Sequence, residues 1–149
     1  MPSQEVIFVV KMPLRFVWSF MNDRVEVGCL FPGCKRVEIL NELDSIWTVE
    51  MSLGPFSRVL AMQGHTTELV ENERISWTAT HERLVTSGSA TFRKVSEEET
   101  EITYRLEGQV TGHFTFLQDM VVAEKLGELT RSFMKNIKER LEMKVEKKT

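Results

Sequence analysis

The chain has 149 residues, of which 42% are hydrophobic and 28% charged, and its formal net charge is −3. This length suits one compact domain with a single hydrophobic core, so we expect residues 1–149 to form one unit. Basic residues cluster only in the tail Lys144–Lys148, which argues against a nucleic-acid partner.

Membrane, secreted and metal-binding proteins are also disfavoured. No apolar run approaches the roughly 18 to 20 residues that cross a bilayer, and the N-terminus lacks the pattern of a signal peptide, so we expect no transmembrane segment and a cytoplasmic location. Cys29 and Cys34 are the two cysteines. Their spacing matches neither a redox C-x-x-C motif nor a complete zinc site, and the histidines are scattered. We therefore expect reduced thiols, with no metal and no cofactor.

The N-terminal region predicts one strand and two short helices. Gln4–Val10 is rich in β-branched residues and predicts a strand. After Pro13, which the first turn of a helix tolerates, apolar residues recur at helical spacing at Leu14, Val17, Trp18 and Met21. Asn22–Asp23 ends this helix and caps a second short one, which Pro32–Gly33 terminates.

From there to Val110 the apolar period is two, which is typical of strands. Trp47–Leu53, Ile75–Ala79 and Ile102–Leu106 each alternate apolar and polar residues, and Val85–Val95 is rich in Thr and Ser. Short polar clusters separate these segments. The pattern predicts a run of about six antiparallel strands.

Two segments of this run depart from simple alternation. In the extended stretch Arg58–Val70, both the Leu60–Met62 and the Val59–Ala61 parities are apolar, so the inward face of this strand stays open. Ser96–Thr100 is acidic and polar, and we expect it to form a solvated hairpin tip.

A long amphipathic helix completes the chain. Thr115 and Gln118 have the spacing of a capping box. Apolar residues then follow at helical spacing at Val122, Leu126, Leu129, Phe133, Ile137 and Leu141. A helix from about Phe116 to Lys144 would be roughly 40 Å long.

This order of elements predicts an α+β fold in which a curved antiparallel sheet of six to seven strands wraps around the C-terminal helix. The concave face of such a sheet is wider than one helix, so either bulky side chains fill the remainder or a cavity persists. The inward residues include both large and small ones, which favours a cavity. The expected ligand-binding residues are Met51, Met62, Trp77, His81, Phe92, Tyr104, Phe114, Val122 and Leu126.

Two turn motifs give a family resemblance. Phe31-Pro32-Gly33-Cys34 resembles the I-P-G-C motif of the G-subunit family of carbon monoxide dehydrogenase, and Leu53-Gly54-Pro55-Phe56 resembles its V-G-P-[IV] turn. The resemblance extends from Glu5 to about Leu141. It implies the helix-grip fold of the START-like superfamily, which includes Bet v 1 homologues, polyketide cyclases and lipid-transfer domains.

The function expected from this combination is binding of a small hydrophobic or amphipathic ligand, such as a lipid, isoprenoid, quinone or polyketide-like molecule. We expect access to the cavity between the long helix and the loops at Gly54–Pro55 and Thr111–His113. The resemblance implies an accessory role beside a carbon monoxide dehydrogenase-like oxidoreductase. We expect no enzyme activity and assign no catalytic residue. The alternative is a cyclase or aromatase that uses polar pocket residues, for which the candidates are Gln63, His65, His81 and Tyr104.

Overall fold

The computed structural model describes residues 3–53, 56–82, 84–110 and 116–146. The elements in chain order are β1 (Ser3–Val10), α1 (Leu14–Met21), α2 (Arg24–Gly28), β2 (Cys34–Ile39), β3 (Asp44–Leu53), β4 (Phe56–Val70), β5 (Arg74–His81), β6 (Leu84–Ser96), β7 (Glu99–Val110) and α3 (Phe116–Glu146). This order confirms the predicted α+β architecture.

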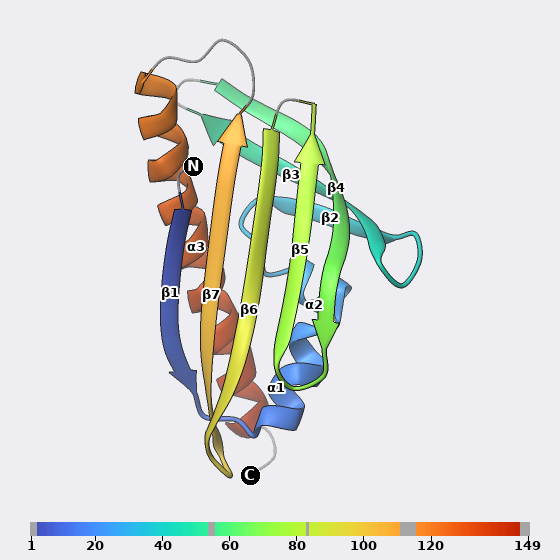
Figure 1. The fold of residues 1–149 in the computed structure, drawn as a ribbon, viewed down its shortest axis with the longest axis vertical. Coiled ribbons are helices and arrows are strands. Elements are labelled where there is room, and N and C mark those ends of the chain that lie inside the picture. Colours follow the sequence, from blue (N-terminus) through green and yellow to red (C-terminus); the bar gives the residue numbers. More distant parts are fainter. Residues whose placement is uncertain (1–2, 54–55, 83, 111–115, 147–149) are drawn as a thin grey trace.

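The strands form one antiparallel sheet in the order β1-β7-β6-β5-β4-β3-β2. Strands β2 to β7 pair with their neighbours in sequence, whereas β1 joins the far edge beside β7 and places Val6 opposite Tyr104. Figure 1 shows the sheet bending around α3, with α1 and α2 at one end. The long helix packs mainly against β1 and β7, so the sheet extends well beyond the strip that the helix covers.

The predicted caps and turns position the short helices. Asp23 is the N-cap of α2, and its Oδ1 accepts a hydrogen bond of 3.1 Å from the main-chain N–H of Glu26. The turn into β2 depends on Gly33, whose φ is +84°. A Cβ at Gly33 would collide with the main-chain carbonyl of Glu50. Glycine is thus required in this turn both for its backbone angle and for the close approach of β3.

The apolar stripe of α3 forms the centre of the core. The buried residues of this stripe are Leu126, Leu129, Phe133, Ile137 and Leu141. Most of them join the inward side chains of β1, β6 and β7 in one cluster. The capping box expected at Thr115 lies outside the described residues. None of the helices in the described ranges is long and apolar enough to span a bilayer.

Strand pairing settles which face of β4 points inward. Leu60 and Met62 are buried, whereas Val59 is 61% exposed. Met62 lies opposite Trp47 of β3, on the concave face. The inward parity of this strand is therefore that of Leu60 and Met62.

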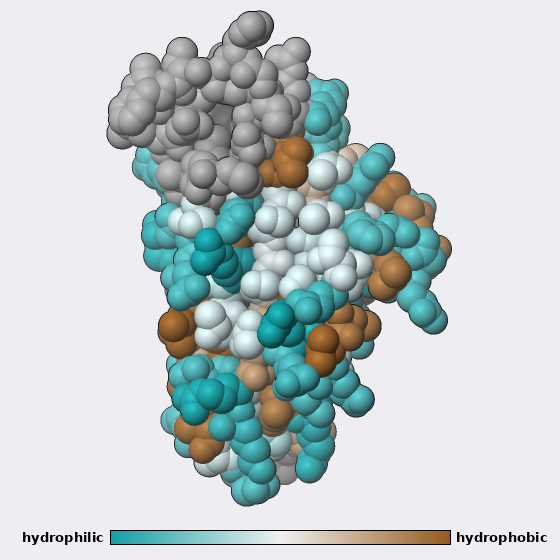
Figure 2. Space-filling model, viewed as in Figure 1, coloured by the Kyte–Doolittle hydropathy of each residue, from teal (hydrophilic) through white to brown (hydrophobic). Residues whose placement is uncertain are grey.

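The outer face of the sheet is less apolar at its surface than the hairpin between β2 and β3. Over β5 and β6 the view in Figure 2 shows mostly polar and intermediate side chains. Apolar side chains lie on the hairpin between β2 and β3, where Ile39, Leu40 and Leu43 are exposed. The concave face, in contrast, carries the buried apolar side chains of the sheet, such as Met62 and Tyr104.

The predicted hairpin tip at Ser96–Thr100 is wrong at its last residue. Thr100 has no exposed surface, and its Oγ1 donates a hydrogen bond of 2.8 Å to the main-chain carbonyl of Met12. The reason is that β7 already begins at Glu99, and Thr100 pairs with Val10 of β1. This polar side chain is therefore buried, because it lies in a paired strand and is hydrogen-bonded to the segment that follows β1.

Candidate functional site

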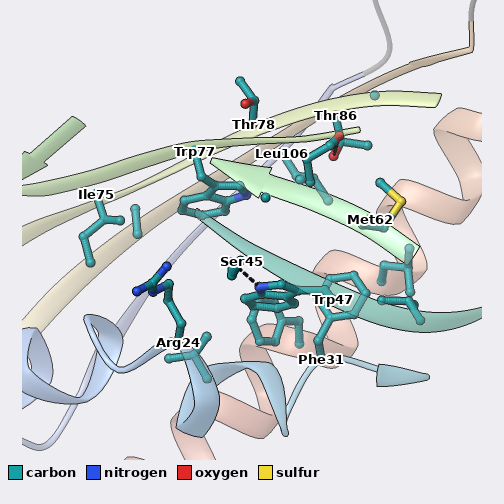
Figure 3. A pocket seen from close by; sticks show the side chains of 18 of the residues that line it. Arg24, Phe31, Ser45, Trp47, Met62, Ile75, Trp77, Thr78, Thr86 and Leu106 are labelled. Carbon is teal, nitrogen blue, oxygen red and sulfur yellow. Dashed lines mark hydrogen bonds between the residues drawn. The ribbon is translucent and has the colours of Figure 1, made fainter. Parts of the chain in front are cut away.

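A cavity of about 190 Å³ lies between the concave face of the sheet and the helices (Figure 3). Its lining residues belong to strands β3 to β7 and to α1, α2 and α3, and Phe31 comes from the turn before β2. The apolar side chains of the lining include Met21, Val27, Phe31, Trp47, Val49, Met62, Ile75, Trp77, Ala79, Leu84, Ala90, Tyr104, Leu106, Leu126, Leu129 and Phe133.

Five aromatic rings form a continuous chain along the wall. The ring of Phe31 lies 6.2 Å from Trp47 and 5.1 Å from Phe133, both nearly edge to face. Phe133 in turn meets Tyr104 at 5.7 Å, and Tyr104 meets Trp77 at 5.6 Å. Aromatic pairs at these separations are favourable beyond their buried area. The rings therefore fix the shape of the cavity rather than filling it.

Small residues on β6 and β7 make room for large neighbours. Gly88 lies opposite Trp77, and a Cβ at Gly88 would stand 2.5 Å from Cζ2 of the indole. A Cβ at Gly108 would stand 3.2 Å from both methyl groups of Leu126. These two glycines thus let Trp77 and Leu126 pack close to the backbone of the sheet.

The buried hydroxyl of Ser45 lies within the apolar wall beside Trp47. Ser45 is 4% exposed, and its Oγ accepts a hydrogen bond of 3.0 Å from Nε1 of Trp47. Gly64, opposite Ser45 in the sheet, provides the space, since a Cβ there would lie 3.1 Å from that oxygen. Because a hydroxyl can donate and accept together, Ser45 can still donate a hydrogen bond toward a guest.

Arg24 brings a cation to the same end of the cavity. Its Nη1 donates to the main-chain carbonyl of Asp44 at 3.0 Å, and its Nη2 donates to that of Asn41 at 2.7 Å. The residue follows the N-cap of α2 and lines the cavity. In Figure 3 it reaches from α2 toward Ile75 and Trp77.

The nearby carboxylate of Asp44 is engaged elsewhere. Its Oδ1 lies 2.7 Å from Nδ1 of His65. This hydrogen bond, with a smaller contribution from the Asn41 side chain, lowers the pKa of Asp44 below its ordinary value. Asp44 and His65 lie opposite each other in the sheet, and Ser45, which points inward, follows Asp44 directly. The hydrogen-bonded pair therefore lies on the outer face of the sheet, and His65 is also among the residues that border the cavity.

The predicted ligand-binding residues are distributed unevenly. The cavity is lined by Met62, Trp77, Tyr104 and Leu126. His81 shares their face through its pairing with Leu84, but its Nδ1 lies 3.0 Å from the Ala61 carbonyl oxygen and the residue is outside the lining. Phe92 is buried beside Trp18, with a ring separation of 5.9 Å, and is also outside it. Phe114 and the side chains of Met51 and Val122 fall outside the described residues, as do the loops expected to form the access route.

Several lining residues were not among the predicted ones. Phe31 and Phe133 belong to the turn motif and to the helical stripe, so their patterns could have indicated an inward position. Ser45 and Arg24 gave no such signal, because their place in the site depends on contacts between α2 and the hairpin of β2 and β3. Among the described residues, no three His, Cys, Asp or Glu side chains come together as metal ligands.

Solved structures with the same arrangement define the fold class. A conserved protein from Geobacillus kaustophilus matches with a TM-score of 0.79 and 15% identity over 93% of this chain and 94% of its own. The ZhuI aromatase/cyclase from Streptomyces sp. R1128 matches with 0.76 and 15% over 96% and 94%. A START superfamily protein from Mycobacterium smegmatis matches with 0.76 and 15% over 95% and 97%. The protein thus has the START-like helix-grip fold.

The family follows from the sequence. The model of the carbon monoxide dehydrogenase G-subunit family (CoxG) matches residues 7–145. The chain belongs to this family, as its two turn motifs indicated. The sequence comparison with curated proteins found no match.

Proposed function

We propose that the protein binds a small hydrophobic or amphipathic molecule in the cavity between the sheet and α3. The observation that carries this proposal is the cavity of about 190 Å³ with its chain of five aromatic rings. Protein interiors are normally packed to the density of organic crystals, so a space of this size in the centre of a domain fits a guest molecule.

The energetics require little specific chemistry. A ligand that removes about 300 Å² of apolar surface from water gains about 7 kcal/mol before the costs of association and ordering. The wall is mostly pre-formed by ring contacts, which reduces the ordering cost. Affinity in the micromolar range is therefore within reach of hydrophobic burial alone.

Tryptophan fluorescence gives a direct test. Trp47 and Trp77 line the cavity, whereas Trp18 belongs to α1 and is outside the lining. In a Trp18→Phe background, saturable changes in emission on titration with decanol would report occupation of the cavity. Native mass spectrometry of protein purified from its own host would identify the class of any copurifying ligand.

A pair of alanine positions separates binding in the cavity from binding to the surface. Ala79 lines the cavity, and Ala61 is exposed on the neighbouring strand β4. Ala79→Phe is expected to abolish the fluorescence response by filling the space, whereas Ala61→Phe is expected to leave it unchanged. An equal response from both variants would contradict the proposal.

We also propose that the ligand-bound protein acts beside a carbon monoxide dehydrogenase-like oxidoreductase, because the matched family is described as a subunit of that enzyme. Affinity purification of the tagged protein from its host, with mass spectrometry of the copurifying chains, tests this role. Recovery of the oxidoreductase chains in a fixed ratio supports it, and their absence under mild cross-linking contradicts it.

The geometry favours binding over a cyclase-like reaction. Of the polar candidates for catalysis, Gln63 is exposed and His65 is paired with Asp44 on the outer face. Tyr104 is 1% exposed, and burial raises the pKa of its hydroxyl, so this group stays protonated. These groups are not brought together in the cavity as an acid and a base.

A further inference from the structure

The polar end of the cavity indicates what kind of ligand it selects. We propose, building on the binding function above, that the ligand is an amphiphile with an anionic oxygen head group, a carboxylate or a phosphate. This head group accepts hydrogen bonds from the guanidinium of Arg24 and the hydroxyl of Ser45. The apolar part of the ligand lies along the rings of Trp47 and Trp77.

The positive charge of Arg24 borders the cavity without an ion-pair partner among the described residues. Its two hydrogen bonds go to the neutral main-chain carbonyls of Asn41 and Asp44. The Asp44 carboxylate is hydrogen-bonded to His65, and Arg24 makes only the smallest of the contributions that lower the pKa of Asp44. In the described part of the chain, Arg24 takes part in no ion pair, and no residue of the cavity lining carries a carboxylate.

The acids that flank Arg24 in the sequence have other partners as well. Asp23 caps α2 by accepting from the main-chain N–H of Glu26. The carboxylate of Glu26 lies 3.7 Å from Nη1 of Arg140. A cation beside an apolar space, with its neighbouring acids engaged elsewhere, favours a guest that supplies the missing negative charge.

The donor groups of Arg24 and Ser45 lie at the same end of the cavity. Nη1 of Arg24 is bonded to the carbonyl of Asp44, and the next residue along the chain is Ser45. The guanidinium therefore lies within one peptide unit of the residue that carries the buried hydroxyl, and Figure 3 shows Ser45 between Arg24 and Trp47. A guanidinium has five N–H groups, and the carbonyls use only part of this set in Arg24. The remaining donors and the Ser45 hydroxyl suit a head group with two or more acceptor oxygens.

The second cationic side chain of the lining provides a contrast. Lys125 lies on α3, and its Nζ is 3.7 Å from Oε2 of Glu128. Its charge thus has a carboxylate partner on the same helix, unlike that of Arg24. Lys125→Gln removes a positive charge from the same cavity without touching the Arg24–Ser45 end, so it is the matched control.

The test compares ligands that share one alkyl chain and differ in the head group. Decanoate, decyl phosphate, decanol and decyltrimethylammonium compete with the neutral probe Nile red at pH 8. The wild type is expected to bind one or both anions at least about tenfold more tightly than decanol, and the cation most weakly. Stronger binding of decanoate points to a fatty-acid-like ligand, and stronger binding of decyl phosphate points to a phosphorylated one. Anion affinity no greater than that of decanol would overturn the proposal.

The variants assign the preference to residues. Arg24→Gln is expected to lower anion affinity until the ratio of anion to decanol affinity, both measured on that variant, falls to about one. Ser45→Ala removes part of the preference, and Lys125→Gln retains it. If the Arg24→Gln variant still binds the anions more tightly than decanol, the inference is overturned.

Two further outcomes keep the test decisive. Absence of all binding by the wild type overturns the proposed function together with the inference, whereas binding of decanol without a preference for anions overturns the inference alone. If Arg24→Gln does not fold, Arg24→Lys, which keeps the charge but loses the paired donors, must still show a reduced preference.

Discussion

The indole of Trp77 lies directly over the backbone of Gly88, so close that a methyl group at Gly88 would stand 2.5 Å from the ring. This pairing of a large and a small residue on adjacent strands holds Trp77 at the edge of the cavity. Gly88→Ala is therefore expected to lower the free energy of unfolding by about 1–3 kcal/mol, because the ring must shift. The displaced ring also reduces the space for a ligand, so Nile red affinity falls with it.

Gly127→Ala makes the same glycine-to-alanine substitution at a position where the neighbouring side chain can move aside. A Cβ there would meet Nη1 of Arg131 at 3.1 Å, which is the mobile end of a long side chain, and the glycine lies inside α3. Alanine favours a helix interior over glycine by about 1 kcal/mol. We expect urea denaturation to show a gain of up to about 1 kcal/mol. A loss as large as that of Gly88→Ala would contradict this interpretation of α3.

The inward face of β4 can be checked by truncating one residue of each parity. Met62→Ala removes a buried side chain and is expected to cost about 2–5 kcal/mol, while enlarging the cavity so that bulkier ligands gain affinity. Val59→Ala, on the exposed face, is expected to change stability by less than about 0.5 kcal/mol. Equal costs would mean that the register of β4 is wrong.

The hydrogen bond between Asp44 and His65 predicts how the stability of the fold depends on pH in the acid range. The hydrogen bond from His65 lowers the pKa of Asp44 in the folded state. A lowered carboxyl pKa contributes stability above the unfolded value of about 3.9, and this contribution is lost as pH falls through the folded pKa. Asp44→Asn should therefore unfold more easily at neutral pH, and its stability should fall less steeply below about pH 4. Thermal melts across this range measure it, with Glu42→Gln, an exposed residue of the same turn, as the control.

The buried hydroxyl of Thr100 anchors the segment between β1 and α1. Thr100→Val keeps the shape of the side chain but leaves the main-chain carbonyl of Met12 without this donor, at an expected cost of about 1–3 kcal/mol. Thr91→Val, at an exposed position of β6, serves as the control and is expected to be nearly neutral. If the two variants have the same melting temperature, the Thr100 hydrogen bond does not stabilise the fold.

Much of the fold could be predicted because periodicity and turn chemistry are local. The stripe from Leu126 to Leu141, the cap at Asp23 and the alternation around Trp77 each indicated the element that the structure contains. The parity of Arg58–Val70 could not be predicted, since apolar residues occupy both faces and only pairing with β3 distinguishes them.

The polar end of the cavity, formed by Arg24 and Ser45, could not be predicted for a related reason. In the sequence Arg24 is indistinguishable from a surface charge, and its place depends on carbonyl groups of Asn41 and Asp44, 17 and 20 residues away. Ser45 lies near the start of a strand, where its inward direction is fixed by pairing with Gly64. Contacts between distant segments leave no periodic mark in the residues that make them.

The pairing of β1 with β7 bears on how the chain reaches this state. Strand β1 is made first, yet Ser3 pairs with Glu107, so all of the other strands are synthesised before its partner is complete. During synthesis, the hairpins from β2 to β6 can assemble while β1 waits, because closing so long a loop costs entropy that no local contact returns. Docking of β1 then completes the sheet edge against which α3 packs, and α3 supplies Leu126, Leu129 and Phe133 to the cavity wall, so we expect the binding compartment to close only after β7 and α3 are made.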